Sequence, residues 1–93
     1  MKVKIKYLGP IKNITGVASE KIEVPTGFSI DGLLGLLIRR HGEEFKSLFI
    51  YNTFNHISQN PQIRFFKDGK MLMSEEKLHD MDEVIIIKMV TGG

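Results

Sequence analysis

The sequence predicts one α+β domain in which a single main helix packs on one face of a sheet of four to five strands. Three observations predict it. Polar and apolar side chains alternate in residues 2–8 and again at about 18–24, a helical period replaces this alternation over residues 30–41, and further strand-like segments follow. The chain has 93 residues, which is enough for one modest core and too few for two. We therefore expect residues 1–93 to form a single domain.

Composition excludes several classes of protein. Apolar residues make up 42% and charged residues 26% of the chain, which is typical of a globular domain and not of a disordered one. There are no cysteines, so disulfides, thiolate catalysis and cysteine-ligated metals are excluded. No apolar run is long enough to span a bilayer and no segment resembles a signal peptide. We therefore expect a cytoplasmic protein with no membrane partner.

Two strands open the predicted sheet. Residues 2–8 alternate lysines with apolar side chains, which is typical of a half-buried strand. Gly9-Pro10 interrupts this strand, and residues 11–16 are predicted to form a turn. A second alternating segment follows at about 18–24. Two such strands joined by a short connection predict an antiparallel hairpin.

The main helix is predicted over residues 30–41, where the apolar residues recur with the spacing of one helical face. Ser29 is the expected N-cap and Gly42 the expected C-cap. Gly32 and Gly35 each weaken a helix by about 1 kcal/mol relative to alanine. We interpret them as positions that let the helix lie close to the sheet.

Two segments of different character follow the main helix. Residues 43–51 predict a short second helix anchored by Phe45, Leu48 and Phe49. Residues 52–61 are largely polar and end in Asn60-Pro61, which predicts a loop.

The remaining strands lie toward the end of the chain. Ile63 to Phe66 predicts a short strand, Asp68-Gly69 is a strong hairpin signal, and Met71 to Met73 is expected to pair back. Residues 74–82 predict turns. The last strand is predicted from Glu83 to Val90, and its core Val-Ile-Ile-Ile is apolar on both faces. Such a run indicates that both faces are covered, one by the helix and the other by a further cover or a partner.

No arrangement of side chains predicts catalysis or metal binding. The histidines have no metal-ligand spacing, and His41 is best explained as a cation at the end of the main helix. Asp80, Asp82 and Glu83 cluster before the last strand, and we interpret them as a solvated turn in preference to a catalytic pair.

Lysines form a stripe on the first strand at positions 2, 4 and 6. A basic stripe is compatible with RNA binding. The net charge is only +2 and acidic residues are interleaved, so a solvent-facing edge strand is the favoured interpretation. Nucleic acid is therefore an unlikely partner.

The sequence ends in Val90-Thr91-Gly92-Gly93, directly after a strand. Glycine makes up about 7% of residues, so a chance Gly-Gly ending occurs in roughly one chain in two hundred. Glycines fit a narrow tunnel because they have no Cβ. A flexible tail over residues 90–93 can thus present its own carboxylate to another protein. A carboxylate must first be activated, typically as a mixed anhydride with AMP, before a sulfur or amine nucleophile takes the acyl group.

The chain resembles the MoaD/ThiS family of ubiquitin-like sulfur carriers. Four segments carry the resemblance. Two lie in the first half of the chain: the first strand Val3-Lys4-Ile5 leading to Gly16, and the leucine-rich helix from Ile30 to His41. The other two are the turn Asp80-Met81-Asp82-Glu83-Val84, which is similar to the family's Asp-Gly-Asp-Glu-Val, and the ending Val90-Thr91-Gly92-Gly93. This resemblance implies a β-grasp, ubiquitin-like fold with a mixed sheet in which the first and last strands are parallel neighbours.

The resemblance also implies a function in which the chain is a carrier and not an enzyme by itself. A partner related to ubiquitin-activating enzymes would use ATP and Mg²⁺ to adenylate Gly93, and a persulfide donor would convert the adenylate to a thiocarboxylate. The tail would then enter the large subunit of molybdopterin synthase and give its sulfur to a pterin precursor. No cofactor would be bound stably by this chain.

Partner binding would involve the tail residues Val90, Thr91 and Gly92 together with an apolar patch on the sheet, formed by Ile85, Ile87, Phe65 and Phe66. Alternatives remain open at this point. The same tail would suit sulfur carriage for tRNA thiolation or thiamin synthesis, or a ubiquitin-like protein modifier. A β-grasp interaction module whose tail is never activated is a further alternative.

Overall fold

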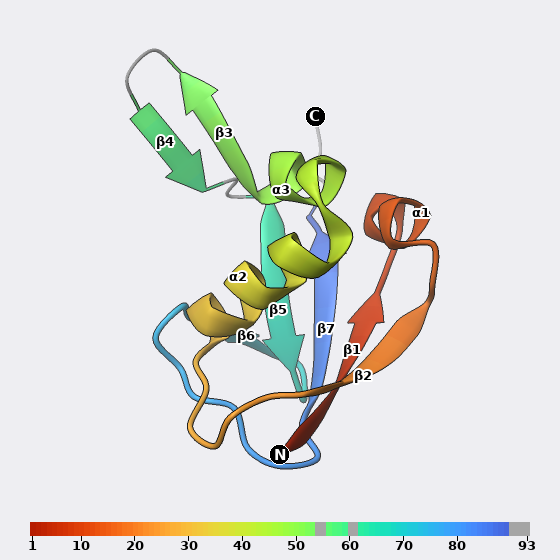
Figure 1. The fold of residues 1–93 in the computed structure, drawn as a ribbon, viewed down its shortest axis with the longest axis vertical. Coiled ribbons are helices and arrows are strands. Elements are labelled where there is room, and N and C mark those ends of the chain that lie inside the picture. The colour runs from red at the N-terminus through yellow and green to blue at the C-terminus, as the bar shows by residue number, and fades with distance from the viewer. Residues whose placement is uncertain (54–55, 60–61, 90–93) are drawn as a thin grey trace.

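The computed structural model describes residues 1–53, 56–59 and 62–89, and for residues 50–53 and 56–59 it describes the backbone. The elements are β1 (Lys2–Tyr7), α1 (Pro10–Thr15), β2 (Ser19–Glu23), α2 (Ile30–His41), α3 (Glu43–Phe49), β3 (Ile50–Thr53), β4 (His56–Gln59), β5 (Ile63–Lys67), β6 (Lys70–Leu72) and β7 (Glu83–Lys88). Five strands form one sheet in the order β2-β1-β7-β5-β6, with α2 across one face (Figure 1).

The sheet is mixed, as expected from the resemblance. β1 and β7 are parallel neighbours at its centre, with Ile5 opposite Val84. The other pairs, β1 with β2, β5 with β7 and β5 with β6, are antiparallel. The first and last strands of the chain therefore lie side by side (Figure 1).

The main helix forms over the residues that the sequence predicted. Ser29 is its N-cap, and the Ser29 hydroxyl accepts a hydrogen bond of 3.0 Å from the Gly32 N–H. Gly42 ends it with φ near 87°, a conformation that favours glycine. The interpretation of the two internal glycines was wrong. A Cβ at Gly32 would meet the Phe28 ring at 3.0 Å, and one at Gly35 would meet nothing within 4 Å, so neither brings the helix onto the sheet.

Two predicted irregular segments contain regular structure. Residues 10–15 form the helix α1 in place of a turn, with Pro10 at its start, where a missing N–H has no cost. The predicted loop over residues 52–61 contains most of the β3–β4 hairpin, in which Tyr51 pairs with Ser58. That segment is polar overall, yet it holds β-forming residues that composition alone did not reveal.

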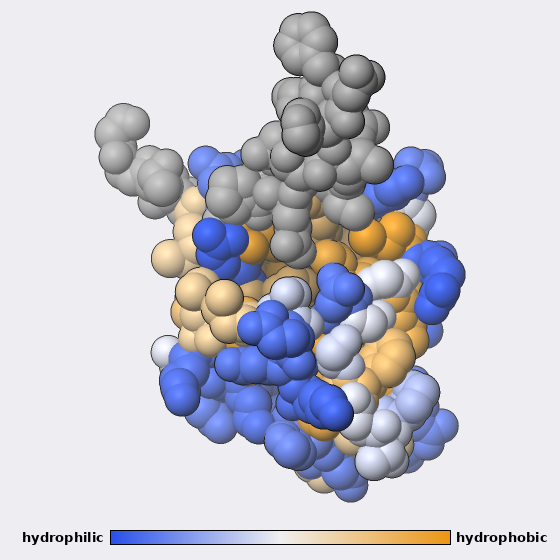
Figure 2. Space-filling view, turned by 90° about the vertical axis from the view of Figure 1, so that its left-hand side faces the viewer, coloured by the Kyte–Doolittle hydropathy of each residue, from blue (hydrophilic) through white to orange (hydrophobic). Residues whose placement is uncertain are grey.

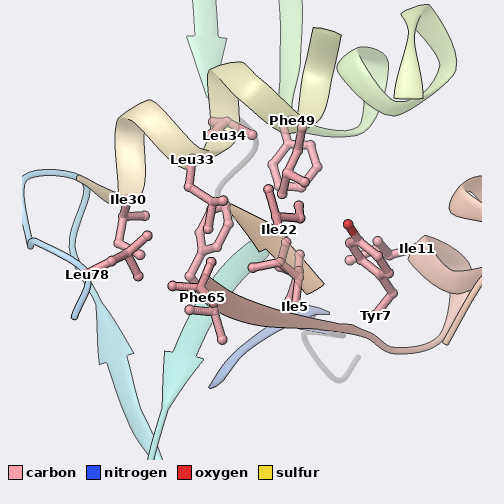
Figure 3. Packing of buried hydrophobic residues seen from close by; sticks show 14 of the residues in the cluster. Ile5, Tyr7, Ile11, Ile22, Ile30, Leu33, Leu34, Phe49, Phe65 and Leu78 are labelled. Carbon is pink, nitrogen blue, oxygen red and sulfur yellow. The ribbon is translucent and has the colours of Figure 1, made fainter. Parts of the chain in front are cut away.

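The core lies between the sheet and the helices, and Figure 3 shows its central part. β1 contributes Val3, Ile5 and Tyr7, all almost fully buried. The other members are Ile11, Ile22, Val24, Ile30, Leu33, Leu34, Leu37, Phe45, Phe49, Ile63, Phe65, Leu78, Val84 and Ile86. Each such side chain contributes roughly 1.5–3 kcal/mol by burial, so this cluster holds the helices on the sheet.

Candidate functional site

β7 carries the chain toward its last residues through the middle of the sheet. It is hydrogen-bonded to β1 on one side and to β5 on the other. The Met89 N–H then donates to the Gln62 carbonyl at 2.6 Å. The carboxyl end of β7 lies at the same end of the molecule as α1 and α3 (Figure 1). The predicted site residues Val90, Thr91, Gly92 and Gly93 lie outside the described residues, and their roles stay predictions.

Residues along β7 alternate between two environments. Val84 and Ile86 are fully buried on the side of α2. Ile85 and Ile87 lie on the face turned away from α2 and are half-buried. Within the described part of the chain, the second face is thus only partly covered, so of the two covers that the sequence left open, a further element of the chain or a partner, the first is at most partial.

The two phenylalanines of β5 separate onto these two faces. Phe66 pairs with Ile85 and is half-buried on the face away from α2. Phe65 pairs with Ile86, is only 5% exposed, and stacks on Phe49 with ring centroids 5.9 Å apart (Figure 3). The prediction that Phe65 belongs to a surface patch was therefore wrong, because the Phe65 side chain lies in the core.

Three exposed apolar residues extend the patch beyond the prediction. Leu8 follows the lysine phase of β1, and Met71 pairs with Phe66 across the β5–β6 hairpin. Met89 follows Ile87 with the same period of two. All three are between 44% and 46% exposed. The sequence contained a signal for these three residues, because extending the strand alternation to their positions places them on the same face.

We call this surface the open face, and it consists of Leu8, Phe66, Met71, Ile85, Ile87 and Met89. Figure 2 views the molecule from the β6 edge of the sheet, so the open face is seen only edge-on; in this view hydrophobic residues lie mostly in the upper part and hydrophilic residues mostly in the lower part. Charged groups adjoin the open face on both sides of β7. Lys6 on β1 pairs with Ile85 and forms a half-exposed ion pair of 3.4 Å with Glu83, and the half-buried Arg64 on β5 pairs with Ile87. An apolar surface next to the strand that leads to the tail is suited to protein docking.

A buried carboxylate fixes the turn that enters β7. Asp82 is 8% exposed, accepts a hydrogen bond of 2.8 Å from the His79 N–H, and pairs with the Lys67 ammonium at 2.7 Å. Burial alone would raise the pKa of Asp82, but the bonds from Lys67 and His79 outweigh burial and lower it. The hydrogen bond to Asp82 in turn raises the pKa of Lys67. The expectation of a solvated cluster was wrong for Asp82, while Asp80 and Glu83 are exposed.

A second buried network ties the end of α2 to the sheet. The Glu20 carboxylate accepts a bond from the Tyr7 hydroxyl at 3.0 Å and lies 2.9 Å from His41 Nε2 and 2.5 Å from Arg40 Nε. Burial, reinforced by the Glu20 charge, raises the pKa of Tyr7 well above its usual range. His41 is a helix-end residue as predicted, and its partner Glu20 comes from another strand. The network braces the fold and offers no site for a substrate.

Among the described residues, no group of three or more histidines, aspartates or glutamates is placed to hold a metal ion. No helix in the described segments has both the length and the apolar character needed to cross a membrane.

The fold and the central strand leading to a glycine-ended sequence define a class of protein, the ubiquitin-like β-grasp carriers and modifiers. The family model described as the ThiS family matches residues 5–93. This chain therefore belongs to the ThiS family. No curated protein matches the chain.

Solved structures agree with this assignment. A putative molybdopterin converting factor, subunit 1, from Pyrococcus furiosus is 28% identical, with a TM-score of 0.78 over 97% of this chain and 99% of that one. SAMP1 from Haloferax volcanii is 15% identical, with a TM-score of 0.79 over 100% of both chains. A chain of the BexX/CysO complex from Amycolatopsis orientalis is 16% identical, with a TM-score of 0.66 over 98% of this chain and 99% of that one. The last two share the fold with this chain.

Proposed function

We propose that this protein is a sulfur carrier that serves molybdopterin biosynthesis as the small subunit of molybdopterin synthase. The observation that carries the proposal is the ending Val90-Thr91-Gly92-Gly93 on the central strand of a ThiS-family domain. The molybdopterin role is supported by the 28% identity to a protein described as a molybdopterin converting factor subunit. No side chain of this chain needs to be catalytic, because the reacting group is the carboxylate of Gly93.

The proposed chemistry proceeds in steps that balance. The Gly93 carboxylate attacks the α-phosphorus of ATP on a partner enzyme, which uses Mg²⁺, and pyrophosphate leaves. A persulfide sulfur then attacks the acyl carbon of the adenylate, and AMP leaves. A thiol of the donor system cleaves the resulting acyl disulfide, which leaves a thiocarboxylate on Gly93 and a disulfide on the donor. The partners supply positioning and electrostatic stabilisation, and this chain supplies the reacting atom.

The open face is the proposed docking surface for these partners. Its six residues are apolar, with Lys6 and Arg64 beside Ile85 and Ile87, and because it includes β7 it is continuous with the strand that leads to the tail. An enzyme that binds Ile85 and Ile87 would position the last residues of the chain at its own active site. The activating enzyme and the synthase large subunit would use this surface in turn, because each needs the same carboxyl group.

Mass spectrometry tests the activation step. The purified protein is incubated with a ubiquitin-activating-type adenylating enzyme, ATP, Mg²⁺ and a persulfide donor. We expect its mass to increase by the difference between one sulfur and one oxygen atom. A variant that lacks Gly93 is the control and should stay unchanged. An unchanged mass across a panel of such enzymes would favour an interaction module whose tail is never activated.

A second assay identifies the client. The thiocarboxylated protein is mixed with a molybdopterin synthase large subunit and the cyclic pterin precursor, and we expect the dithiolene product to form. Sulfur transfer only to tRNA or to a thiazole precursor would instead assign the carrier to tRNA thiolation or thiamin synthesis. Covalent attachment to lysines of other proteins would assign it to the modifiers.

A further inference from the structure

The outer edge of β2 offers backbone groups for another strand. β2 is an edge strand, at the opposite side of the sheet from β6 (Figure 1). The Val24 N–H bonds to the Met1 carbonyl and the Tyr7 N–H bonds to the Ala18 carbonyl, so the even-numbered residues of this segment turn their backbone groups toward β1. Antiparallel pairing therefore directs the N–H and C=O groups of Ser19, Lys21 and Glu23 outward. No other strand in the described segments pairs with this edge.

A shallow groove, widely open to solvent, lies along this edge between β2 and α2. It has a volume of about 520 Å³ and is lined by residues of both elements. Ile22 and the partly buried Leu36 give it an apolar lining. Free backbone groups beside an apolar lining are the combination that an added strand requires, because such a strand gains main-chain hydrogen bonds and buries alternate side chains.

Positive charge dominates the groove. Lys21, Arg39 and Arg40 line it and are exposed, against the single exposed carboxylate of Glu23. Arg40 uses its Nε for the buried Glu20, yet its side chain stays 54% exposed. A guanidinium has five N–H donors, so its remaining donors stay available to a ligand. This charge favours an occupant with carboxylates.

We propose that the groove between β2 and α2 binds an extended, acidic segment of a partner protein, which adds to β2 as a further strand. Small apolar side chains of the segment would contact Ile22 and Leu36, and its carboxylates would pair with Arg39 and Lys21. An RNA backbone would not use the alternating N–H and C=O groups of the strand edge. The groove lies at the β2 edge of the sheet, and β1 separates that edge from β7, so this proposal is independent of tail activation.

Peptide titration tests the proposal directly. The probe is a capped synthetic peptide in which a Val-Thr-Val-Thr core is flanked by aspartates, and the matched probe carries lysines in place of the aspartates. We expect saturable amide NMR shifts centred on Ser19, Lys21 and Glu23. We expect the lysine probe to bind at least about tenfold more weakly, which corresponds to about 1.4 kcal/mol. Shifts centred on Ile85 and Ile87, or no saturation with the acidic probe, would overturn the proposal.

Two pairs of variants separate backbone pairing from charge. Lys21→Pro and Lys21→Thr remove the same charge, but only the proline removes an outward N–H, which an edge strand tolerates. We expect the proline variant to bind the acidic peptide several-fold more weakly than the threonine variant. Arg39→Gln should weaken binding, whereas Lys70→Gln, the same charge change on the opposite edge, should not. Equal effects within either pair would overturn the proposal, with folding checked by amide dispersion.

Discussion

Neighbouring residues before and along β7 lie in opposite environments. The even positions Asp82, Val84 and Ile86 are buried toward α2, with exposures of 8% or less. The odd positions face the other way, from Met81, which is 79% exposed, to the half-buried Ile85 and Ile87. One face of the strand thus belongs to the core, and the other carries the docking surface proposed above. A run of three isoleucines therefore lies in two environments, which the alternation of the strand separates.

The largest contrast is expected between the two phenylalanines of β5. Phe65→Ala should lower the free energy of unfolding by about 3–5 kcal/mol, because it opens a cavity beneath α2. Phe66→Ala removes a half-buried ring and should cost about 1 kcal/mol. Urea denaturation followed by circular dichroism measures both. Equal losses would show that the open face is packed like the core.

A substitution of Asp82 tests the contribution of the charged group on the buried side of this segment. Asp82→Asn should cost about 1–3 kcal/mol, because it weakens the bond to Lys67 and leaves polar groups poorly matched. The folded state lowers the pKa of Asp82, so its contribution is present above the unfolded pKa and is lost as the pH falls through the folded pKa. Between about pH 5 and pH 2, the wild type should therefore lose more stability than the variant.

Denaturation of both proteins at several pH values provides the measurement for Asp82. Asp80→Asn, an exposed carboxylate in the same turn, serves as the control and should leave the pH dependence close to that of the wild type. A wild-type curve that runs parallel to the Asp82→Asn curve in acid would contradict the assignment.

The Ile87→Glu variant tests the proposed docking surface on the face of β7 turned away from α2. A charge on the open face should reduce the kcat/KM of adenylation by about tenfold or more, equivalent to at least about 1.4 kcal/mol of docking energy. The free energy of unfolding should change by less than about 1 kcal/mol, because the side chain is only half-buried.

The control for Ile87→Glu is Met73→Glu, which places the same charge at an exposed residue beyond β6. It should leave adenylation unchanged. A similar loss in both variants would indicate a general charge effect and would remove the open face from the docking model.

The smallest effect concerns the backbone next to Asp82. Met81 has a φ of 69°, a left-handed conformation that costs an L-residue roughly 1–2 kcal/mol. Glycine adopts it freely but loses about 0.5–1 kcal/mol in chain entropy, so Met81→Gly should stabilise the fold by roughly 0.5–1 kcal/mol. Met73→Gly, where φ is not positive, should be neutral or destabilising. Thermal unfolding compares the two variants, and destabilisation by Met81→Gly would contradict the strain argument.

Local signals made most of the fold predictable from the sequence. α2 was correct because Ser29, Gly42 and the apolar spacing between them all act within a few residues. The Asp68-Gly69 hairpin was correct for the same reason, with positive φ at both positions. α1 and the β3–β4 hairpin were missed because their polar composition resembles that of loops.

The candidate site was less predictable because it depends on contacts between distant residues. Phe65 shares its strand phase with the buried Ile63, and Phe66 shares its phase with the half-buried Arg64, so alternation over the whole strand separates the two rings, whereas the adjacent apolar pair taken alone does not. Asp82 is buried because Lys67 comes to it from another strand, and Glu20 is partly buried because α2 ends above it. The family assignment, by contrast, was predicted from short motifs and is confirmed by the family model that matches residues 5–93.

The pairing of β7 with both β1 and β5 affects how the domain responds to a pulling force. A force applied to the chain beyond Met89 acts along β7 and therefore shears the hydrogen bonds of both the β7–β1 and the β7–β5 pairs. Many of these bonds must then break together instead of one after another. A partner can thus draw the last residues firmly into its own interior while the body outside stays folded.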